Sequence, residues 1–179
     1  TTILIFTGLA VAIAFKAGIF NIGTQGQLVL GALVTGVVLV YLAPLFAGLG
    51  AIGTGIILLI GLVLGAIAGG LYGALPGALK AYADANEVIT TIMLNFVATS
   101  VALYLAQDVF PDPDSFATQT VPLPDYARFP SLVFRARDDF SILALAAAIT
   151  LVFAMFYLLA RTAFGYDIRT SGLQAAAAE

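Results

Sequence analysis

The chain has 179 residues, of which 61% are hydrophobic and only 9% are charged, and its formal net charge is -3. Soluble domains carry roughly 25% charged residues, so this composition excludes an ordinary water-soluble domain and predicts a protein that faces lipid. Cysteine, histidine and tryptophan are absent, which excludes disulfides, Cys/His metal sites and thiol or imidazole catalysis. We therefore expect no cofactor, no metal and no catalytic residue. The few scattered cations offer no basic surface to nucleic acid.

Apolar runs long enough to cross a bilayer recur along the chain. A hydrocarbon core about 30 Å thick needs about 20 apolar residues per helix. We expect five spans, at residues 1–15, 28–46, 52–79, 87–106 and 140–160. The expected fold class is all-α, a polytopic transmembrane helical bundle. Because Thr1 opens directly into an apolar run without a Met or a signal peptide, we expect a fragment of a larger protein.

A polar, glycine-containing segment at residues 16–27 separates the first two spans. Asn21 and Gln25 supply side-chain hydrogen-bonding groups there. Transporters place irregular backbone of this kind where it is buried in protein or lines a cavity, which favours a broken or re-entrant element bordering a pathway. An ordinary short turn is the alternative. No Lys-Ser or Lys-Thr follows a glycine-rich run, so the segment is not a phosphate-binding loop.

Five glycines in the third span recur at a spacing of four, which places them on one helical face. They are Gly61, Gly65, Gly69, Gly73 and Gly77. In lipid, a groove of small residues lets a neighbouring backbone approach closely, so we expect this face to be a helix-packing seam. Pro76 is expected to kink the end of the same helix.

Polar residues recur in the fourth span at the same spacing of four, at Glu87, Thr91, Asn95 and Thr99. Such a stripe must face other helices or a water-filled path, because polar groups are costly in hydrocarbon. For Thr91, Asn95 and Thr99 we expect either a translocation pathway or interhelical hydrogen bonds, and both interpretations stay open. For Glu87 we favour a role at the helix start, with Asp84 or Asn86 as the cap.

The longest polar segment, residues 107–139, contains five prolines and six aspartates, which predicts a water-exposed acidic loop. Short loops on one side of the membrane carry four of the cations, Lys16, Lys80, Arg161 and Arg169. The other three, Arg128, Arg135 and Arg137, lie in the long loop. The positive-inside rule then places residues 107–139 outside and residues 161–179 in the cytoplasm.

The last segment, residues 161–179, is expected to turn at Gly165 and Gly172 and to end in a short helix that starts at Leu173. A helix with small side chains and little charge could rest in a groove on a cytosolic partner. Considered alone, the segment is a polar tail.

Three stretches together resemble the permease family that serves simple-sugar, nucleoside and branched-chain amino-acid ABC importers, closest to its nucleoside and simple-sugar branch. Residues 18–27, Gly-Ile-Phe-Asn-Ile-Gly-Thr-Gln-Gly-Gln, are similar to the family's Gly-hydrophobic-Phe-Asn-Ile-Gly-x-x-Gly-Gln signature. Residues 86–95, Asn-Glu-Val-Ile-Thr-Thr-Ile-Met-Leu-Asn, also resemble the family. Residues 162–173 are similar to its cytoplasmic coupling region. The resemblance covers nearly the whole chain, and residues 1–179 are expected to form one partial transmembrane permease domain.

The resemblance implies a partial permease domain in the plasma membrane that forms a pathway for a nucleoside or simple sugar. The implied partners are ATP-hydrolysing subunits, a second permease subunit in a homo- or heterodimer, an extracytoplasmic substrate-binding protein and membrane lipid. The implied ATPase-coupling residues are Gly165, Asp167, Arg169, Gly172 and Leu173. A secondary transporter or channel for a small polar solute is the alternative, although every charged residue lies in or near an expected loop. An intramembrane enzyme is disfavoured, because nothing organises a Ser or Thr nucleophile.

Overall fold

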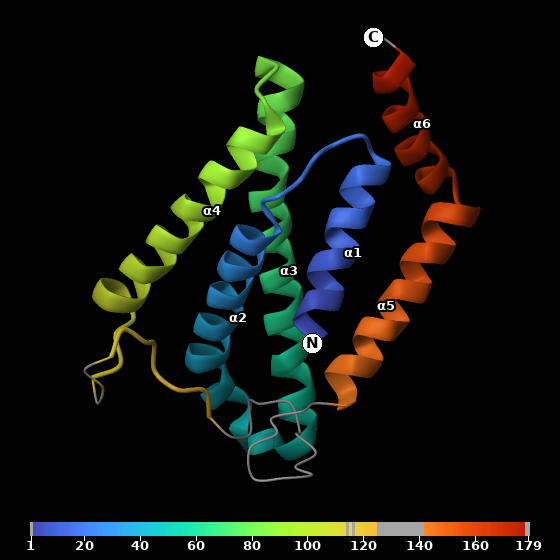
Figure 1. The fold of residues 1–179 in the computed structure, drawn as a ribbon. Coiled ribbons are helices and arrows are strands. Elements are labelled where there is room, and N and C mark those ends of the chain that lie inside the picture. The colour runs from blue at the N-terminus through green and yellow to red at the C-terminus, as the bar shows by residue number, and fades with distance from the viewer. Residues whose placement is uncertain (1, 114, 116, 125–141, 178–179) are drawn as a thin grey trace. The chain divides into compact units, whose positions relative to one another are not determined.

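The computed structural model describes residues 2–113, 115, 117–124 and 142–177 (Figure 1). Its helical elements are α1 (Thr2–Lys16), α2 (Thr24–Phe46), the 3-10 turn η1 (Ala47–Leu49), α3 (Gly50–Ala83), α4 (Glu87–Tyr104), the π-helical turn η2 (Leu105–Val109), α5 (Ile142–Arg161) and α6 (Ala163–Ala177). The predicted all-α fold class is confirmed.

Three helical stretches are long and apolar enough to cross a membrane, namely Thr24–Ala83, Glu87–Val109 and Ala144–Arg161. The first holds both α2 and α3, which fold back on each other at η1 and at Gly50, whose φ is 56°. Helix α1 is apolar but shorter. The five expected spans therefore correspond to α1 through α5. Residues 125–141, including Arg128, Arg135 and Arg137 of the expected acidic loop, lie outside the described residues.

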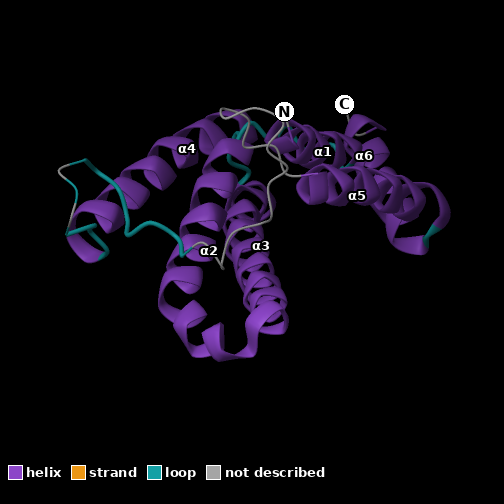
Figure 2. Cartoon of the chain, turned by 90° about the horizontal axis from the view of Figure 1, so that it is seen from below, coloured by secondary structure: helices purple, strands orange, loops and turns teal. Residues whose placement is uncertain are grey.

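The chain divides into two compact units, and the boundary near its start falls between Ile22 and Gly23. One unit contains α1, α5 and α6; the other contains α2, α3 and α4. Figures 1 and 2 show α2 and α3 side by side and antiparallel, with α4 beside α2. The boundary at Ile22–Gly23 lies inside the segment 18–27 that carries the first sequence motif.

Glycines on α3 bring its backbone against α2. A Cβ added to Gly61 would lie 3.2 Å from the Leu39 side chain, and one added to Gly69 would lie 2.9 Å from the carbonyl oxygen of Gln27. The Thr35 hydroxyl donates a hydrogen bond of 3.0 Å to the carbonyl of Gly61. At the far end of this seam, Leu39, Ala43 and Ile57 form a buried apolar cluster. Close backbone approach is what a small-residue groove provides in lipid.

The glycine series does not contact α2 over its whole length. Gly73 still lies against the Gln27 side chain, whose Cδ would be 3.0 Å from an added Cβ. A Cβ on Gly77 would have no neighbour within 4 Å. The reason is the length of α2, which begins at Thr24 and has no residue at the level of Gly77. Helix α3 continues as a helix through Pro76 to Ala83.

Replacement of Gly65 by Ala tests the close approach of α2 and α3. An added Cβ would lie 2.8 Å from the Gly31 carbonyl oxygen, so overpacking should outweigh the better helix propensity of Ala. We expect a net destabilisation of about 1–2 kcal/mol. The measurement is SDS- or heat-induced unfolding of the full-length subunit in detergent.

The matched control for this substitution is Gly70→Ala, one residue beyond Gly69 on the same helix. A Cβ at Gly70 meets nothing within 4 Å, so the variant should be neutral or stabilised by up to about 1 kcal/mol. Equal effects of the two substitutions would contradict this packing of α2 on α3.

Candidate functional site

The N-terminus of α2 is capped by a side chain from α4. Gly23 occupies the N-cap position and makes no side-chain capping bond. The backbone N–H of Gly26, at the third helical position, instead donates to Oδ1 of Asn95 over 2.8 Å. The first N–H groups of a helix have no partner within the helix, and lipid offers none. Asn95 thus supplies from a different helix the acceptor that a Ser or Asp cap would supply locally.

Gly26 fits this contact because it has no side chain. A Cβ there would lie 3.0 Å from the Asn95 Oδ1 atom, 3.1 Å from the Ala98 Cβ and 3.2 Å from the Asn95 Cα. Ala98 is fully buried. A larger residue at position 26 would push α2 away from α4 and lengthen the hydrogen bond. The two motifs at 18–27 and 86–95 therefore meet at Gly26 and Asn95.

The polar stripe of α4 is divided between a buried and an exposed part. Thr91 is fully buried and its hydroxyl donates to the Glu87 carbonyl over 2.6 Å. Thr99 is exposed and its hydroxyl donates to the Asn95 carbonyl over 2.9 Å. Of the expected pathway residues outside α4, Asn21 is half-buried in the connection 17–23 and Gln25 is exposed in the first turn of α2. Residues 24–27, expected in an irregular element, are therefore helical.

Helix α3 adds further polar groups to the same place. The Tyr72 hydroxyl donates to the carbonyl of Leu94 on α4 over 2.7 Å. The Gln27 side chain lies against Gly73. Three helices thus gather uncharged polar groups around the start of α2, and we name this set the polar junction: Gly26, Gln27, Tyr72, Thr91 and Asn95.

The polar junction lies well inside the unit formed by α2, α3 and α4. Gly73, opposite Gln27, is ten residues before the end of α3 at Ala83, which corresponds to about 15 Å along the helix. Asn95 is eight residues after the start of α4 at Glu87, or about 12 Å. Helix α2 therefore begins deep beside α3 and α4, a geometry that fits a broken element better than an ordinary surface turn.

The corner between α3 and α4 is held by charge and capping. The Lys80 ammonium lies 3.1 Å from the Asp84 carboxylate and 3.6 Å from that of Glu87. Asp84 ends α3 in the left-handed conformation, with φ 47°. The Asn86 side chain caps α4 by accepting N–H bonds from Val88 and Ile89. Between the two caps considered from the sequence, Asn86 is the one that the structure has. Glu87 acts in an ion pair at the helix start.

The segment expected to turn at Gly165 and Gly172 is one continuous helix, α6, so that expectation was wrong. The corner lies earlier, at Thr162, whose hydroxyl accepts the Gly165 N–H over 3.1 Å and thereby caps α6. Gly165 is buried against the last turn of α5, where an added Cβ would be 2.5 Å from the Leu159 Cα. Gly165 is therefore needed for close packing at the corner and not for a turn.

Gly172 packs against the end of α1. A Cβ there would lie 2.6 Å from the Lys16 carbonyl oxygen and 3.0 Å from the Gly18 nitrogen. A Cβ on Gly18 would in turn lie 2.9 Å from the Gly172 Cα. Backbone meets backbone at this crossing of α1 and α6, which we call the glycine crossing (Gly18 and Gly172).

The remaining coupling candidates face outward from α6. Asp167, Arg169 and Leu173 are exposed, and Leu173 is 70% exposed. Two aromatic side chains that the sequence did not single out, Phe164 and Tyr166, are also more than half exposed. Their apolar surface was the signal available in the sequence, since aromatic residues are enriched at protein interfaces.

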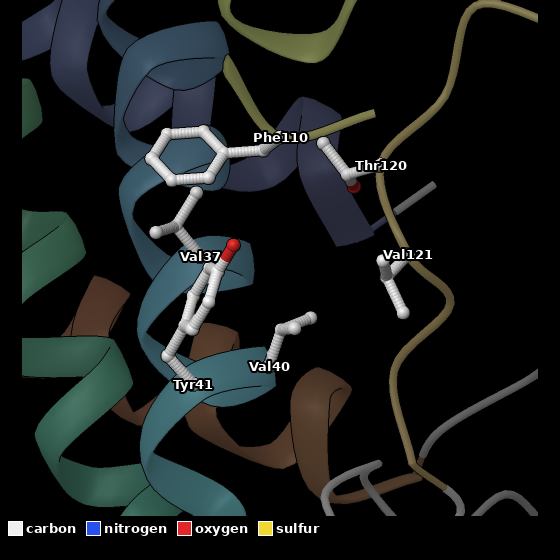
Figure 3. Close-up of a pocket in the computed structure, with 6 residues that line it drawn as sticks. All are labelled: Val37, Val40, Tyr41, Phe110, Thr120 and Val121. Atoms are coloured by element: carbon white, nitrogen blue, oxygen red, sulfur yellow. The ribbon is translucent and has the colours of Figure 1, made fainter. Parts of the chain in front are cut away.

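At the other end of α2, the first part of the acidic loop folds back on the helix. The Phe110 ring packs edge-on to Tyr41 with 5.7 Å between ring centroids. The Asp112 N–H donates to the Gln119 carbonyl over 3.1 Å, and the Gln119 amide donates to the Asp112 carboxylate over 2.9 Å. Figure 3 shows the small apolar hollow that results, lined by Val37, Val40, Tyr41, Phe110, Thr120 and Val121.

The fold and the polar junction define a polytopic helical membrane protein with uncharged polar groups buried between its helices. Residues 1–179 match the family model described as branched-chain amino acid transport system / permease component. The chain belongs to this permease family, and it is part of a multi-pass protein of the plasma membrane. No solved structure shows a significant match.

Three curated relatives of the chain are permease proteins of ABC transporters. A guanosine ABC transporter permease protein of Bacillus subtilis is 33% identical over 94% of this chain and 46% of its own length. A glucose ABC transporter permease protein of Haloferax volcanii is 31% identical over 94% of this chain and 44% of its own length. A nucleoside ABC transporter permease protein of Lactococcus lactis is 31% identical over 98% of this chain and 48% of its own length. The chain spans less than half the length of each of these relatives.

The hydrogen bond that caps α2 predicts the effect of Asn95→Leu. Leu has nearly the same shape but cannot accept the Gly26 N–H, which leaves a buried donor unsatisfied. We expect the full-length subunit to lose about 1–3 kcal/mol of unfolding free energy, measured by unfolding in detergent.

Thr99→Val is the control on the same helix, because the exposed Thr99 hydroxyl bonds only its own helix in the described contacts. Its effect should stay within about 0.5 kcal/mol. An Asn95→Leu variant as stable as the wild type would show that the cap is not formed.

Proposed function

We propose that the chain is the part of an ABC importer permease subunit that borders the translocation pathway for a nucleoside or simple sugar. The observation that carries the proposal is the family match over residues 1–179. Nucleoside and sugar permease proteins among the relatives support this choice of substrate. ATP is hydrolysed by a separate subunit, and this chain transports only within the complete complex.

The polar junction supports an uncharged, hydroxyl-rich solute. Its side chains include two amides, of Gln27 and Asn95, and two hydroxyls, of Tyr72 and Thr91, and none of the five residues is a Lys, Arg, Asp or Glu. Amides and hydroxyls both donate and accept hydrogen bonds, as ribose and hexose hydroxyls do. A charged solute would need a countercharge in a bilayer interior. In this proposal Thr91 and Asn95 lie at the pathway, with Asn21, Gln25 and Thr99 along its border.

The proposed orientation places the acidic loop, residues 107–139, outside and the coupling segment, residues 161–179, in the cytoplasm. An extracytoplasmic substrate-binding protein then docks on the outer side. The ATP-hydrolysing subunits bind α6 through its exposed side chains, which include Phe164, Tyr166, Asp167, Arg169 and Leu173. A second permease subunit completes the pathway within the lipid.

Co-purification of the full-length subunit with its ATPase tests the assignment. Leu173→Ala removes an exposed apolar side chain at the proposed docking face, so we expect recovery of the ATPase to fall about tenfold, as for an interface anchor. Gly8→Ala is the control, because a Cβ at Gly8 meets nothing within 4 Å. If no ATPase co-purifies with the wild-type subunit, the proposal fails, and a channel or secondary transporter takes its place.

Competition for uptake tests the substrate class. In vesicles that contain the complete importer, unlabelled guanosine or glucose should reduce uptake of the transported labelled solute, whereas leucine should not. The reason is that the polar junction offers hydrogen bonds without a charge to pair with an amino acid's ammonium or carboxylate. Competition by leucine alone would overturn the nucleoside or sugar assignment.

A further inference from the structure

We infer that Gly18 and Gly172 are positioning residues that join the coupling helix α6 to the start of α2 through the connection 17–23. This inference rests on the proposed function, since it concerns how ATPase movement reaches the polar junction. It gives α6 two separate roles that the sequence analysis treated as one. Exposed side chains bind the ATPase, and Gly172 transmits the movement of α6 to the end of α1.

The first observation is the direct contact of backbone with backbone between α6 and the end of α1. At the glycine crossing, the Gly172 Cα lies 2.9 Å from where a Gly18 Cβ would be, and the Lys16 carbonyl lies 2.6 Å from where a Gly172 Cβ would be. Side chains can absorb a small displacement by changing rotamer, but backbone in contact with backbone cannot. Close-packed interiors transmit strain in this way. Movement of α6 is therefore passed directly to residues 16–18.

The second observation is that the chain leaving this crossing is rigid at its start. The Gly18 N–H donates to the Phe15 carbonyl over 3.1 Å and the Ile19 N–H donates to the Ala14 carbonyl over 3.0 Å. With Gly18 at φ +74°, these bonds form a Schellman motif. The Phe15 and Phe20 rings also pack edge-on with centroids 4.7 Å apart. Residues 17–20 are thus fixed to α1 and move with it.

The third observation is that the segment 18–27, fixed to α1 at its start, is held a second time near its other end. Only seven residues separate Gly18 from Gly26, whose N–H is held by Asn95. The boundary between the two compact units, at Ile22–Gly23, falls between these anchors. The covalent chain therefore leads from the glycine crossing, across a unit boundary, to the N-terminus of α2 at the polar junction. This arrangement gives a physical reason for glycine at both positions 18 and 26.

Helix formation does not explain why residue 172 is a glycine. It lies inside α6, where Ala would be the better helix former. No positive φ requires glycine there, since the structure's positive-φ glycines among the described residues are Gly18 and Gly50. Close approach to Lys16 and Gly18 is the remaining reason. Gly172→Ala should therefore leave α6 helical while it pushes α6 away from α1.

The experiment uses the complete importer, reconstituted with its ATPase and binding protein, and compares Gly172→Ala with Leu173→Ala and Gly8→Ala. For Gly172→Ala we expect the ATPase to co-purify and to hydrolyse ATP normally. The amount of solute transported per ATP should fall about tenfold, the range of coupling changes seen for residues away from ligands, with KM unchanged. Leu173→Ala should instead recover about tenfold less ATPase, and Gly8→Ala should behave as the wild type.

Each outcome decides between transmission and a structural role. If Gly172→Ala lowers ATP hydrolysis and transport by the same factor, the inference is overturned and Gly172 has only a packing role. Normal transport per ATP would also overturn it. Failure of the wild-type subunit to recover any ATPase would instead refute the proposed function.

A second measurement covers the case in which Gly172→Ala does not assemble. Cysteines replace Lys16 and Ser171, both exposed neighbours of the glycine crossing in a chain without native cysteine, and a short bismaleimide joins them. Since α6 and residues 16–18 move together in this account, the cross-linked importer should transport at the rate of the unlinked variant. Loss of transport on cross-linking would contradict the inference.

Discussion

The hydrogen bond from the Gly26 amide to Asn95 is the constraint on which the arrangement of α2, α3 and α4 depends. A helix that begins inside a bilayer has unpaired N–H groups that lipid cannot satisfy, each at a cost of several kcal/mol. Asn95 provides the acceptor only if α2 and α4 touch, and they touch only because residue 26 has no side chain. The start of α2 is thereby fixed beside Gly73 and Tyr72 of α3. An amide that serves as a cap is also a polar group deep among the helices.

A glycine that lets a neighbouring segment approach closely recurs at three places: between Gly65 and Gly31, between Gly26 and Asn95, and between Gly18 and Gly172. In water the hydrophobic effect would drive helices together with large apolar side chains. In lipid that drive is absent, and dispersion between closely approaching backbones takes its place. The same feature that stabilises the pairs makes them stiff, because a glycine contact has no rotamer to adjust. Stability and the transmission of movement therefore have a common physical origin here.

Local periodicity predicted the helices well but could not pair them. The spans and the glycine face of α3 follow from residues three or four apart, which a sequence displays directly. For the cap of α4 the sequence left Asp84 and Asn86 as alternatives, and the structure has Asn86. The partner of Asn95 is 69 positions away, at Gly26, and no local pattern identifies it. The expected turn at Gly172 was wrong because glycine was assigned to chain reversal, whereas a contact with Lys16 and Gly18 accounts for it. Tyr72 was missed since its polar partner, the Leu94 carbonyl, is backbone on another helix.

Amide hydrogen exchange at Gly26 measures the central interaction most directly. The full-length subunit, labelled with ¹⁵N-glycine and placed in nanodiscs, would be followed by NMR with and without the Asn95→Leu change. The account predicts slow exchange of the Gly26 amide in the wild type and exchange at least about tenfold faster in the variant, for a loss of about 1.4 kcal/mol or more of protection. The Gly36 amide, within α2, should be unaffected. Fast exchange of Gly26 in the wild-type subunit would contradict the cap, and with it the position assigned to the start of α2.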